Sequence, residues 1–190
     1  MKLIVGLWNP WIEYAKTRHN IWFMIVDDFV DREKPPFALQ TTPLIKWGNT
    51  RAYDNKRKWE IFETNIDGQK ILFLKPMEFM NRSWWAVGAL AHFYKIDSKD
   101  ILVIHDDIDL PMSKIQLKLW WSSGGHNWLK DIIAVLDTPN FRRLRVGISR
   151  PANQNDVADY VLHPFKKEEK ESIESKMDEI EKQIKKFIAG

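Results

Sequence analysis

Hydrophobic residues occur in short runs that alternate with longer segments of helical spacing. Five short runs are rich in Leu, Ile and Val and are bounded by turn-forming residues, which is the pattern of strands in a sheet. We predict a β-strand at each of these runs. They are residues 2–7 (KLIVGL), 70–75 (KILFLK), 101–105 (ILVIH), 114–119 (KIQLKL) and 144–148 (LRVGI).

Between these runs, apolar residues recur at intervals of three and four, as they do on the buried face of a helix. This spacing predicts helices over 20–32, 83–95 and 127–136. At the C-terminal end, 166–188 has the same pattern, and we expect one long amphipathic helix there. Strands that alternate with helices predict an α/β fold.

The spacing of two predicted strands indicates a mixed sheet. The runs at 101–105 and 114–119 are too close for a helical crossover, so we expect them to pair antiparallel. No repeat or linker divides the chain, and we predict one domain over residues 1–190. Its core is a mixed, mostly parallel twisted sheet flanked by helices. The segment 149–156 (SRPANQND) is the best candidate for a mobile loop.

The composition is that of a folded soluble protein. Of 190 residues, 44% are hydrophobic and 29% are charged, which suffices for the core of one domain. The absence of cysteine excludes disulfides and thiolate catalysis and is compatible with the reducing cytoplasm, where we expect the protein. No stretch approaches the roughly 20 apolar residues that span a bilayer, so we expect no membrane partner.

The net charge is only weakly informative. Lys and Arg number 29 against 26 Asp and Glu, an excess of three. Charges balance within 166–186, so the excess lies in the body of the chain, where Arg142, Arg143, Arg145 and Arg150 cluster. Such a cluster is either solvated surface or a face that binds nucleic acid.

Polar residues gather where predicted strands end or predicted helices begin, which is where open α/β sheets bind ligands. A histidine among carboxylates and neutral amides suits a site with one general base, because the free imidazole pKa of about 6.5 allows proton exchange near neutrality. The clusters are Asn9 with His19-Asn20, Met80-Asn81, His105-Asp106-Asp107 and Gly124-Gly125-His126-Asn127.

Each cluster also has a structural interpretation. His19 and Asn20 follow Thr17 and can simply cap a helix. Asn81 and Asn127 can be helix caps in the same way. None of these amides therefore decides the function alone.

The acidic cluster has two alternatives of its own. Asp106, Asp107 and Asp109 can form a solvated turn before Pro111. With His105 they can also form a metal-binding loop, although no recognised ligand spacing accompanies them.

Taken together and in order, six long motifs resemble the bacterial peptidyl-tRNA hydrolase family. They are VGLWNPWIEYAKTRHNIWF (5–23), KPMEFMNRSWWAVGALAHFYKI (75–96), ILVIHDDIDLPMSKIQLKL (101–119), SSGGHNWLKDIIAVL (122–136), FRRLRVGISRP (141–151) and DVADYVLHPF (156–165). The resemblance covers nearly the whole chain except a variable 34–60, and a series of this length is specific. It implies an enzyme of translation that cleaves the ester between a peptide and the 3′ ribose of tRNA.

The resemblance also implies roles for individual residues. His19 matches the family's catalytic base, which activates water, and Asp106 matches the carboxylate that orients it. Other matching positions hold the 3′ end and the peptide backbone or line the crevice. The amides that hold the substrate are Asn9, Asn81 and Asn127, and the lining residues are Tyr14, Met80 and His126.

The chemistry of the substrate agrees with this assignment. An ester is already activated relative to an amide, so one water-activating base with fixed hydrogen-bond donors suffices. The resemblance implies no metal, no organic cofactor and a monomer whose partner is peptidyl-tRNA, bound by its backbone and 3′ end. Basic residues would hold the tRNA backbone, with little base readout. They are Lys114, Lys118, Lys130, Arg142, Arg143 and Arg145.

The chain departs from the family pattern at glycine. Ser113, Asp137, Ser149 and His163 stand where glycine is common, and Trp stands at six further positions. Glycine permits φ > 0 and close backbone approach, which an indole does not. Three explanations stay open: a tolerated change, an altered or inactive variant, or a sequence that differs from the natural gene product. The six positions are Trp8, Trp11, Trp22, Trp84, Trp121 and Trp128.

Two rival functions remain beside ester hydrolysis. One is a catalytically impaired RNA-binding module of the same fold, which cleavage of the ester would exclude. The other is a metal-dependent hydrolase centred on His105, Asp106 and Asp107, which insensitivity to chelators would exclude.

Overall fold

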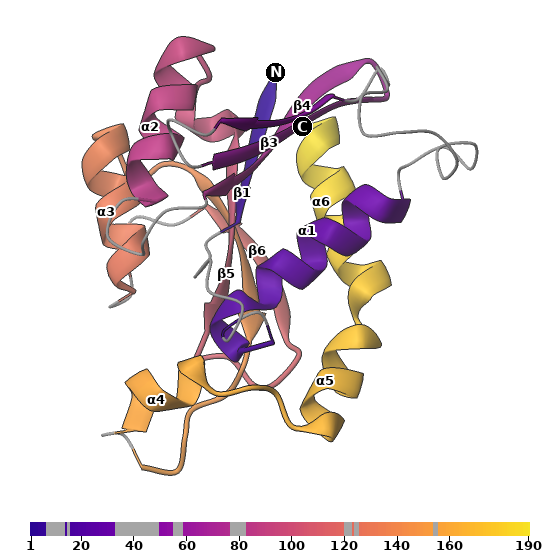
Figure 1. Cartoon of the computed structure of the whole chain (residues 1–190), viewed down its shortest axis with the longest axis vertical. Coiled ribbons are helices and arrows are strands. Elements are labelled where there is room, and N and C mark those ends of the chain that lie inside the picture. Colours follow the sequence, from indigo (N-terminus) through magenta and orange to yellow (C-terminus); the bar gives the residue numbers. More distant parts are fainter. Residues whose placement is uncertain are drawn as a thin grey trace.

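The described part of the chain forms one seven-stranded mixed sheet with helices on both faces (Figure 1). The computed structural model describes residues 1–6, 14, 16–32, 50–54, 59–76, 83–119, 123, 126–153 and 156–190. In sequence, the strands are β1 (Lys2–Gly6), β2 (Thr50–Asp54), β3 (Trp59–Ile66), β4 (Gln69–Pro76), β5 (Ile101–Asp107), β6 (Ile115–Leu119) and β7 (Arg142–Gly147).

The strand order is β2-β3-β4-β1-β5-β7-β6. The four adjacent strands β4, β1, β5 and β7 are parallel to one another. The β2–β3, β3–β4 and β7–β6 pairings are antiparallel. Because β2 and β4 are both antiparallel to β3, only β3 and β6 run against the other strands. The predicted α/β fold with a mixed, mostly parallel sheet is confirmed.

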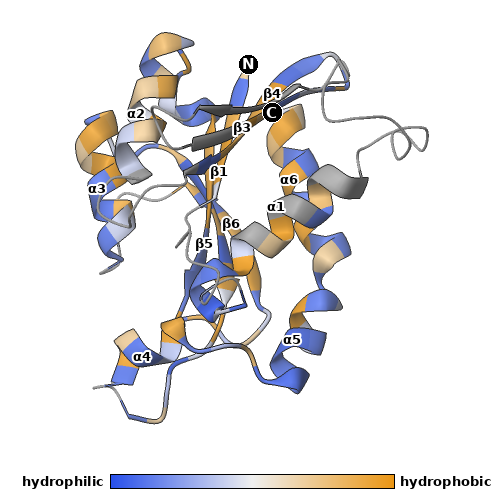
Figure 2. Ribbon diagram, viewed as in Figure 1, coloured by the Kyte–Doolittle hydropathy of each residue, from blue (hydrophilic) through white to orange (hydrophobic). Residues whose placement is uncertain are grey.

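The central strands are almost wholly apolar, because helices cover both faces of the sheet. Helices α2 and α3 lie together on one face, and α1 and α6 cover the other (Figure 1). Residues 3–5, 71–74 and 101–104 are all buried, as expected for parallel strands covered on both sides. Figure 2 shows these strands as the apolar centre of the molecule. None of the described helices is both long and apolar enough to cross a bilayer.

The helices largely follow the predicted segments. The segment 157–162 is an additional helix that the sequence pattern did not predict. The helices are α1 (Ile21–Arg32), α2 (Ser83–Phe93), α3 (Asn127–Leu136), α4 (Val157–Leu162), α5 (Lys167–Glu174) and α6 (Met177–Ala189), with 3₁₀ turns at Arg18–Asn20 and Ser98–Asp100.

The C-terminal segment is amphipathic and helical, as predicted, although it is divided into two successive helices, α5 and α6. At the junction of α5 and α6, the Lys176 N–H donates to the Ile173 carbonyl three residues earlier, at 2.9 Å. The Ser175 hydroxyl donates to the Ser172 carbonyl at 2.7 Å. These contacts tighten the turn and interrupt the α-helix. The apolar face continues across the junction, with Ile173 and Ile180 both buried.

The prediction that β5 pairs with β6 was also wrong. Strand β7 lies between them, antiparallel to β6 and parallel to β5. The connection from β5 crosses the end of β7, where the Ser113 N–H donates to the Gly147 carbonyl at 2.9 Å and the Gly147 N–H donates to the Lys114 carbonyl at 2.8 Å. A Cβ at Gly147 would lie 1.9 Å from the Pro111 carbonyl oxygen, so only glycine allows this crossing.

Strands β2 and β3 were missed, although the sequence carries a signal for β3. Asp67 and Gly68 join β3 to β4, and both have positive φ, 52° and 79°. An Asp-Gly pair of this kind is a strong two-residue hairpin signal. The predicted strand at 70–75 is therefore one arm of a hairpin.

Three residues at glycine-like positions adopt left-handed backbone conformations. Ser113, Asp137 and Ser149 have φ of 58°, 51° and 60°. Asp137 is the C-cap of α3, a site that favours glycine. Each such residue costs roughly 1–2 kcal/mol relative to glycine. His163, with φ of −87°, shows no such need.

Three of the six unusual tryptophans, Trp22, Trp84 and Trp128, pack in or on the core. Trp22 is fully buried, and its ring lies against Gly6, where a Cβ would come within 1.4 Å of the Trp22 Cε3 atom. Trp84 is partly buried against the core. Trp8, Trp11 and Trp121 lie outside the described residues, and Trp128 belongs to the candidate site.

The predicted loop at 149–156 is described only in part. Residues 149–153 form neither helix nor strand. Arg150, within this segment, forms an ion pair with Asp109. The mobility of the segment stays a prediction.

Candidate active site

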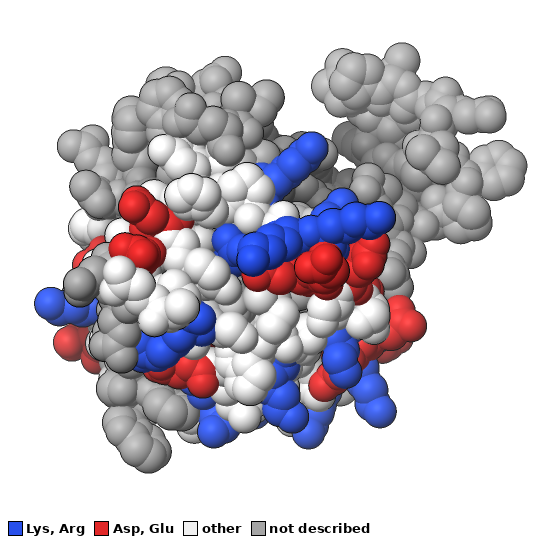
Figure 3. Space-filling model, turned by 90° about the horizontal axis from the view of Figure 1, so that it is seen from below, with Lys and Arg blue, Asp and Glu red and all other residues white. Residues whose placement is uncertain are grey.

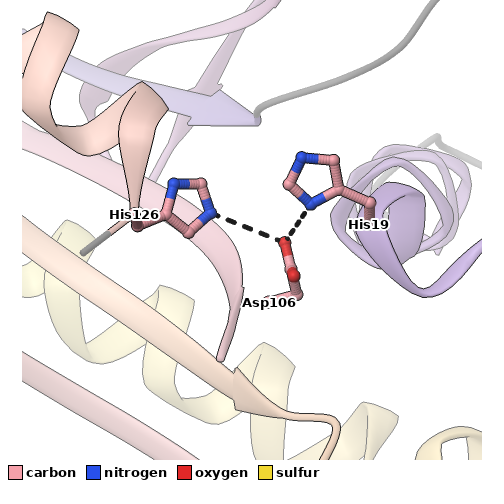
Figure 4. A group of neighbouring side chains, drawn as sticks. All are labelled: His19, Asp106 and His126. Atoms are coloured by element: carbon pink, nitrogen blue, oxygen red, sulfur yellow. Dashed lines mark hydrogen bonds and ion pairs between the residues drawn. The ribbon is translucent and has the colours of Figure 1, made fainter. Parts of the chain in front are cut away.

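His19 lies on the 3₁₀ turn that precedes α1. The Tyr14 carbonyl holds this turn by accepting from the Thr17 N–H at 3.0 Å, the Thr17 hydroxyl at 2.8 Å and the Asn20 amide at 2.8 Å. The Asn20 side chain thus bonds back to the Tyr14 carbonyl, and the capping interpretation of His19 and Asn20 stays a prediction. The His19 side chain points toward Asp106 at the end of β5 (Figure 4).

Asp106 lies near the carboxyl end of β5 and faces His19. Its Oδ1 atom is 2.7 Å from His19 Nδ1, and its side chain is 5% exposed (Figure 4). Burial alone would raise the pKa of Asp106, but the charge of His19 and the nearby His126 ring outweigh it and hold that pKa well below its usual range. The ionised carboxylate accepts a hydrogen bond, so His19 Nδ1 carries the proton and Nε2 keeps a free lone pair.

His126 completes a group of three side chains. It stands directly before α3, and its Nε2 atom lies 3.7 Å from Asp106 Oδ1, too far for a hydrogen bond. Both of its ring nitrogens are buried, and neither has a hydrogen-bond partner among the described residues. The structure thus brings together His19, Asp106 and His126 from three separate segments.

The remaining predicted site residues are less fully defined. Asn127, the first residue of α3, is exposed next to His126. Tyr14 is half-buried, and its described contacts are those of its carbonyl with the His19 turn. Asn9, Met80 and Asn81 lie outside the described residues.

Trp128 packs directly on the predicted base. Its ring centre lies 4.1 Å from that of His19 and 5.9 Å from that of His126. The side chain is buried, with 7% exposed. An indole therefore occupies space beside His19 that glycine would leave open.

His105 is buried beside the site rather than part of a metal loop. Its Nδ1 atom donates to the Asp106 carbonyl at 2.7 Å, which leaves Nε2 as an unprotonated, buried atom. Burial, followed by the charge of His126, lowers the pKa of His105 to about 3. The ring lies edge-on to His126 at 5.2 Å and remains neutral.

The acidic residues of the proposed metal loop have separate partners. Asp107 binds the Arg145 guanidinium at 2.7 Å, and Asp109 binds Arg150. Because successive strand residues point to opposite faces, the Asp106 and Asp107 carboxylates cannot both bind one metal ion. The rival metal centre at His105, Asp106 and Asp107 is therefore not supported by this geometry.

A different group could in principle bind a cation. One atom each from His19, Asp106 and His126 lies within 4.8 Å of the others. Ligands of a tetrahedral zinc ion at 2.0–2.1 Å lie about 3.3 Å apart. The 2.7 Å between His19 and Asp106 is shorter and is a hydrogen-bond distance. This distance fits a proton shared between His19 and Asp106 better than a metal ion bound by both.

The basic residues predicted to hold tRNA differ in access. Lys114, Lys118 and Lys130 are exposed, whereas Arg143 is 2% exposed and cannot present its charge to a backbone outside. The inclusion of Arg143 was wrong. Arg145 is bound to Asp107 and to Gln116, at 3.2 Å. In Figure 3, Lys and Arg side chains adjoin Asp and Glu on the face seen from below.

The mixed sheet, with a histidine–carboxylate pair at its strand ends, defines an α/β protein with a candidate catalytic site. The family model described as "Peptidyl-tRNA hydrolase" matches residues 3–190. The chain belongs to the peptidyl-tRNA hydrolase family.

Relatives and solved structures agree with this membership. The chain is 39% identical over 190 residues to the peptidyl-tRNA hydrolase of Lactobacillus delbrueckii subsp. bulgaricus, covering 100% of this chain and 94% of the relative. It is 42% identical over 178 residues to that of Halalkalibacterium halodurans, covering 94% and 88%. A crystal structure of peptidyl-tRNA hydrolase from Acinetobacter baumannii matches with a TM-score of 0.85 and 35% identity, covering 100% of this chain and 89% of that one.

Proposed function

We propose that this chain hydrolyses the ester between peptide and tRNA, with His19 as the general base and Asp106 as the group that orients it. Family membership supports the substrate, and the 2.7 Å contact between His19 Nδ1 and Asp106 Oδ1 is the observation that carries the mechanism. A buried carboxylate on one ring nitrogen leaves the other nitrogen available to a water molecule.

The reaction follows from this tautomer. His19 Nε2 takes a proton from water as the oxygen attacks the ester carbonyl carbon and forms a tetrahedral oxyanion. Collapse of the oxyanion breaks the bond to the 3′ oxygen, which receives the proton from the imidazolium. The products are a peptide acid and tRNA with a free 3′ hydroxyl. Asp106 stabilises the imidazolium between the two proton transfers, and no covalent intermediate is required.

The neutral amides provide the remaining part of the proposed site. Asn9, Asn81 and Asn127 bind the 3′ end and the peptide backbone, and one of them donates to the oxyanion. Tyr14, Met80 and His126 line the crevice. The position of Asn127 beside His126 supports this arrangement for one of the amides. We infer a monomer that acts in the cytoplasm without a metal or organic cofactor.

One observation favours a second candidate, an RNA-binding module with impaired turnover. The Trp128 indole covers His19 at 4.1 Å between ring centres. A ring in this place competes with substrate for access to the base. Binding to the exposed lysines would survive such a block, because they lie on other surface positions.

A single assay separates the two candidates. The parent protein and His19→Ala are incubated with peptidyl-tRNA, with and without EDTA, and released tRNA is measured. Ester hydrolysis predicts cleavage by the parent, loss in His19→Ala and no effect of EDTA. Binding of peptidyl-tRNA without cleavage by the parent would support the impaired module. Loss of cleavage in EDTA would overturn the mechanism proposed for His19.

A further inference from the structure

Arg18 precedes the predicted base and carries a buried guanidinium. The residue is 3% exposed. Its Nη2 atom donates to Glu169 Oε2 of α5 at 2.6 Å, and its Nη1 atom donates to the carbonyls of Tyr160 and His163 at 3.1 and 3.2 Å. One side chain thus bridges the turn that carries His19 and a segment more than 140 residues later.

Two aromatic rings enclose the same guanidinium. Its central carbon lies 4.2 Å from the ring centre of Tyr160 and 5.6 Å from that of Phe165. A planar guanidinium can stack flat on a ring while its two Nη atoms donate to different acceptors, whereas an ammonium has one donor atom and no plane to stack. The site is therefore specific for arginine rather than for positive charge alone.

Backbone contacts dock the two segments along their length. The Arg18 N–H donates to the His163 carbonyl at 3.2 Å, and the Phe165 N–H donates to the Lys16 carbonyl at 3.4 Å. Thr17 and Pro164 form an isolated antiparallel bridge between these contacts. The 3₁₀ turn spans only three residues, and its N-cap, Thr17, makes no side-chain cap. This docking therefore adds a second set of contacts to those that the Tyr14 carbonyl makes with the turn.

The same segment is tied to the strand end that carries Asp106. The Tyr160 hydroxyl donates to the Ile148 carbonyl at 2.5 Å. The Ile148 N–H in turn donates to the Asp107 carbonyl at 3.0 Å, next to Asp106. Tyr160 therefore connects both sides of the His19–Asp106 pair, through Arg18 on one side and Ile148 on the other.

We propose that Arg18 is a positioning residue, which holds the His19 turn in register with Asp106 by clamping it to residues 160–169. The inference rests on the proposed function, since it assigns Arg18 to the alignment of the proposed base. Arg18 does not touch the reacting atoms, because its side chain is directed to α4 and α5. Its effect on catalysis passes through the distance between His19 and Asp106.

The test is a double-mutant cycle on kcat with peptidyl-tRNA. Arg18→Met and Arg18→Lys are measured alone and combined with Asp106→Asn, at a temperature where circular dichroism shows every variant folded. Misplacement of a reacting group by about 1 Å costs up to about 100-fold. We expect Arg18→Met to lower kcat by roughly 10- to 100-fold with little change in KM. The loss should shrink to a few-fold in the Asp106→Asn background, where the aligned pair no longer exists.

The variant Arg18→Lys shows whether the clamp requires the planar guanidinium or only a positive charge. We expect it to recover only a small part of kcat, because lysine cannot stack and donate to three acceptors together. The matched control is Glu171→Gln, which breaks an exposed ion pair with Lys167 on the same helix α5 and should leave kcat unchanged. If Arg18→Met does not fold, Glu169→Gln weakens the same clamp more gently and enters the same cycle.

The outcomes distinguish this inference from the proposed function. An equal loss from Arg18→Met with and without Asp106→Asn, or full activity in Arg18→Lys, overturns the positioning role while leaving His19 as the base. Full activity in His19→Ala overturns the proposed function itself. A smaller loss in the Asp106→Asn background supports the clamp.

Discussion

The Trp128 ring lies 4.1 Å from the His19 ring, with the two planes inclined by 38°. A glycine at position 128 would leave this space empty. The residue before Trp128 is Asn127, one of the proposed substrate ligands. The indole thus packs against the predicted base and directly follows that proposed ligand in the sequence. This contact determines the first prediction.

We expect Trp128→Gly to raise kcat/KM by reopening access to His19. The same change combined with Trp8→Gly and Trp11→Gly should raise it further if those residues also border the crevice. Steady-state assays on peptidyl-tRNA measure the effect. Trp85→Ala is the control, because Trp85 is 51% exposed on α2. Intact mass of the parent counts its tryptophans and establishes whether the protein made has this sequence. Unchanged activity in both glycine variants would show that the ring does not obstruct the substrate.

His19→Ala should abolish nearly all hydrolysis while the protein stays folded. The side chain is partly exposed and makes a polar contact with Asp106 rather than filling the core. General-base catalysis contributes about 10²- to 10⁴-fold, and the rate of ester cleavage should fall by this order. Rates are compared at equal folded fraction by circular dichroism. Near-full activity would refute the assignment of the base.

Asp106→Asn should lower kcat with a smaller effect on KM. An amide cannot stabilise the imidazolium that forms when His19 accepts a proton, and it can select the wrong tautomer. Asp107→Asn is the informative comparison, because the Asp107 carboxylate binds Arg145 rather than His19. A change confined to KM in Asp106→Asn would make Asp106 a binding residue instead.

Much of the site was predictable because it depends on local pattern and motif. The apolar runs that became β1 and β5 are continuous in the sequence, and His19 and Asp106 lie within long motifs. Other features depend on tertiary contacts. The crossing at Gly147 that moves β6 beyond β7 requires a backbone approach from Pro111, which no local pattern reveals. The stacking of Trp128 on His19 joins segments about 110 residues apart and needs the fold itself.

Some errors had a signal in the sequence. Alternation along a strand directs consecutive side chains to opposite faces, so it already argued against a shared metal at Asp106 and Asp107. His105 ends an apolar run and could have been recognised as buried. The Asp67-Gly68 pair marked a hairpin that would have located β3. In each case the signal is local to a few residues of the sequence.

His105 should make the folded protein less stable as the pH falls below neutrality. Its pKa is lowered to about 3 in the folded state, so between about pH 6.5 and pH 3 the unfolded chain binds a proton that the folded chain does not. The free energy of unfolding therefore decreases as the pH falls through this range, by an amount of order a few kcal/mol. The charged or titratable neighbours that contribute are His126, Asp106 and Asp107.

Urea unfolding at several pH values measures this effect. His105→Asn retains an amide donor for the Asp106 carbonyl but does not titrate, so it should flatten the profile between about pH 6.5 and pH 4.5. The loss caused by Asp106, whose pKa is also lowered, begins only near or below about pH 4. His92→Asn alters an exposed histidine and serves as the control. The same slope in the parent and in His105→Asn would contradict the buried neutral state.

The last prediction concerns the surface that holds tRNA. Phosphate contacts release counterions, so the logarithm of the binding constant should fall with the logarithm of salt concentration by roughly 0.7 to 0.9 per neutralised phosphate. Lys130 is exposed on α3, and its N–H donates to the His126 carbonyl at 3.1 Å, which places it one helical turn from the site. We expect Lys130→Ala to reduce the salt slope by about the value of one phosphate. Lys186→Ala is the matched control, because Lys186 is exposed on α6, across the sheet from α3 (Figure 1). Binding is measured by fluorescence anisotropy with tRNA, and hydrolysis of a small model ester should depend far less on salt. Equal slopes for the parent, Lys130→Ala and Lys186→Ala would show that Lys130 neutralises no phosphate, and the tRNA backbone would then have to follow another face.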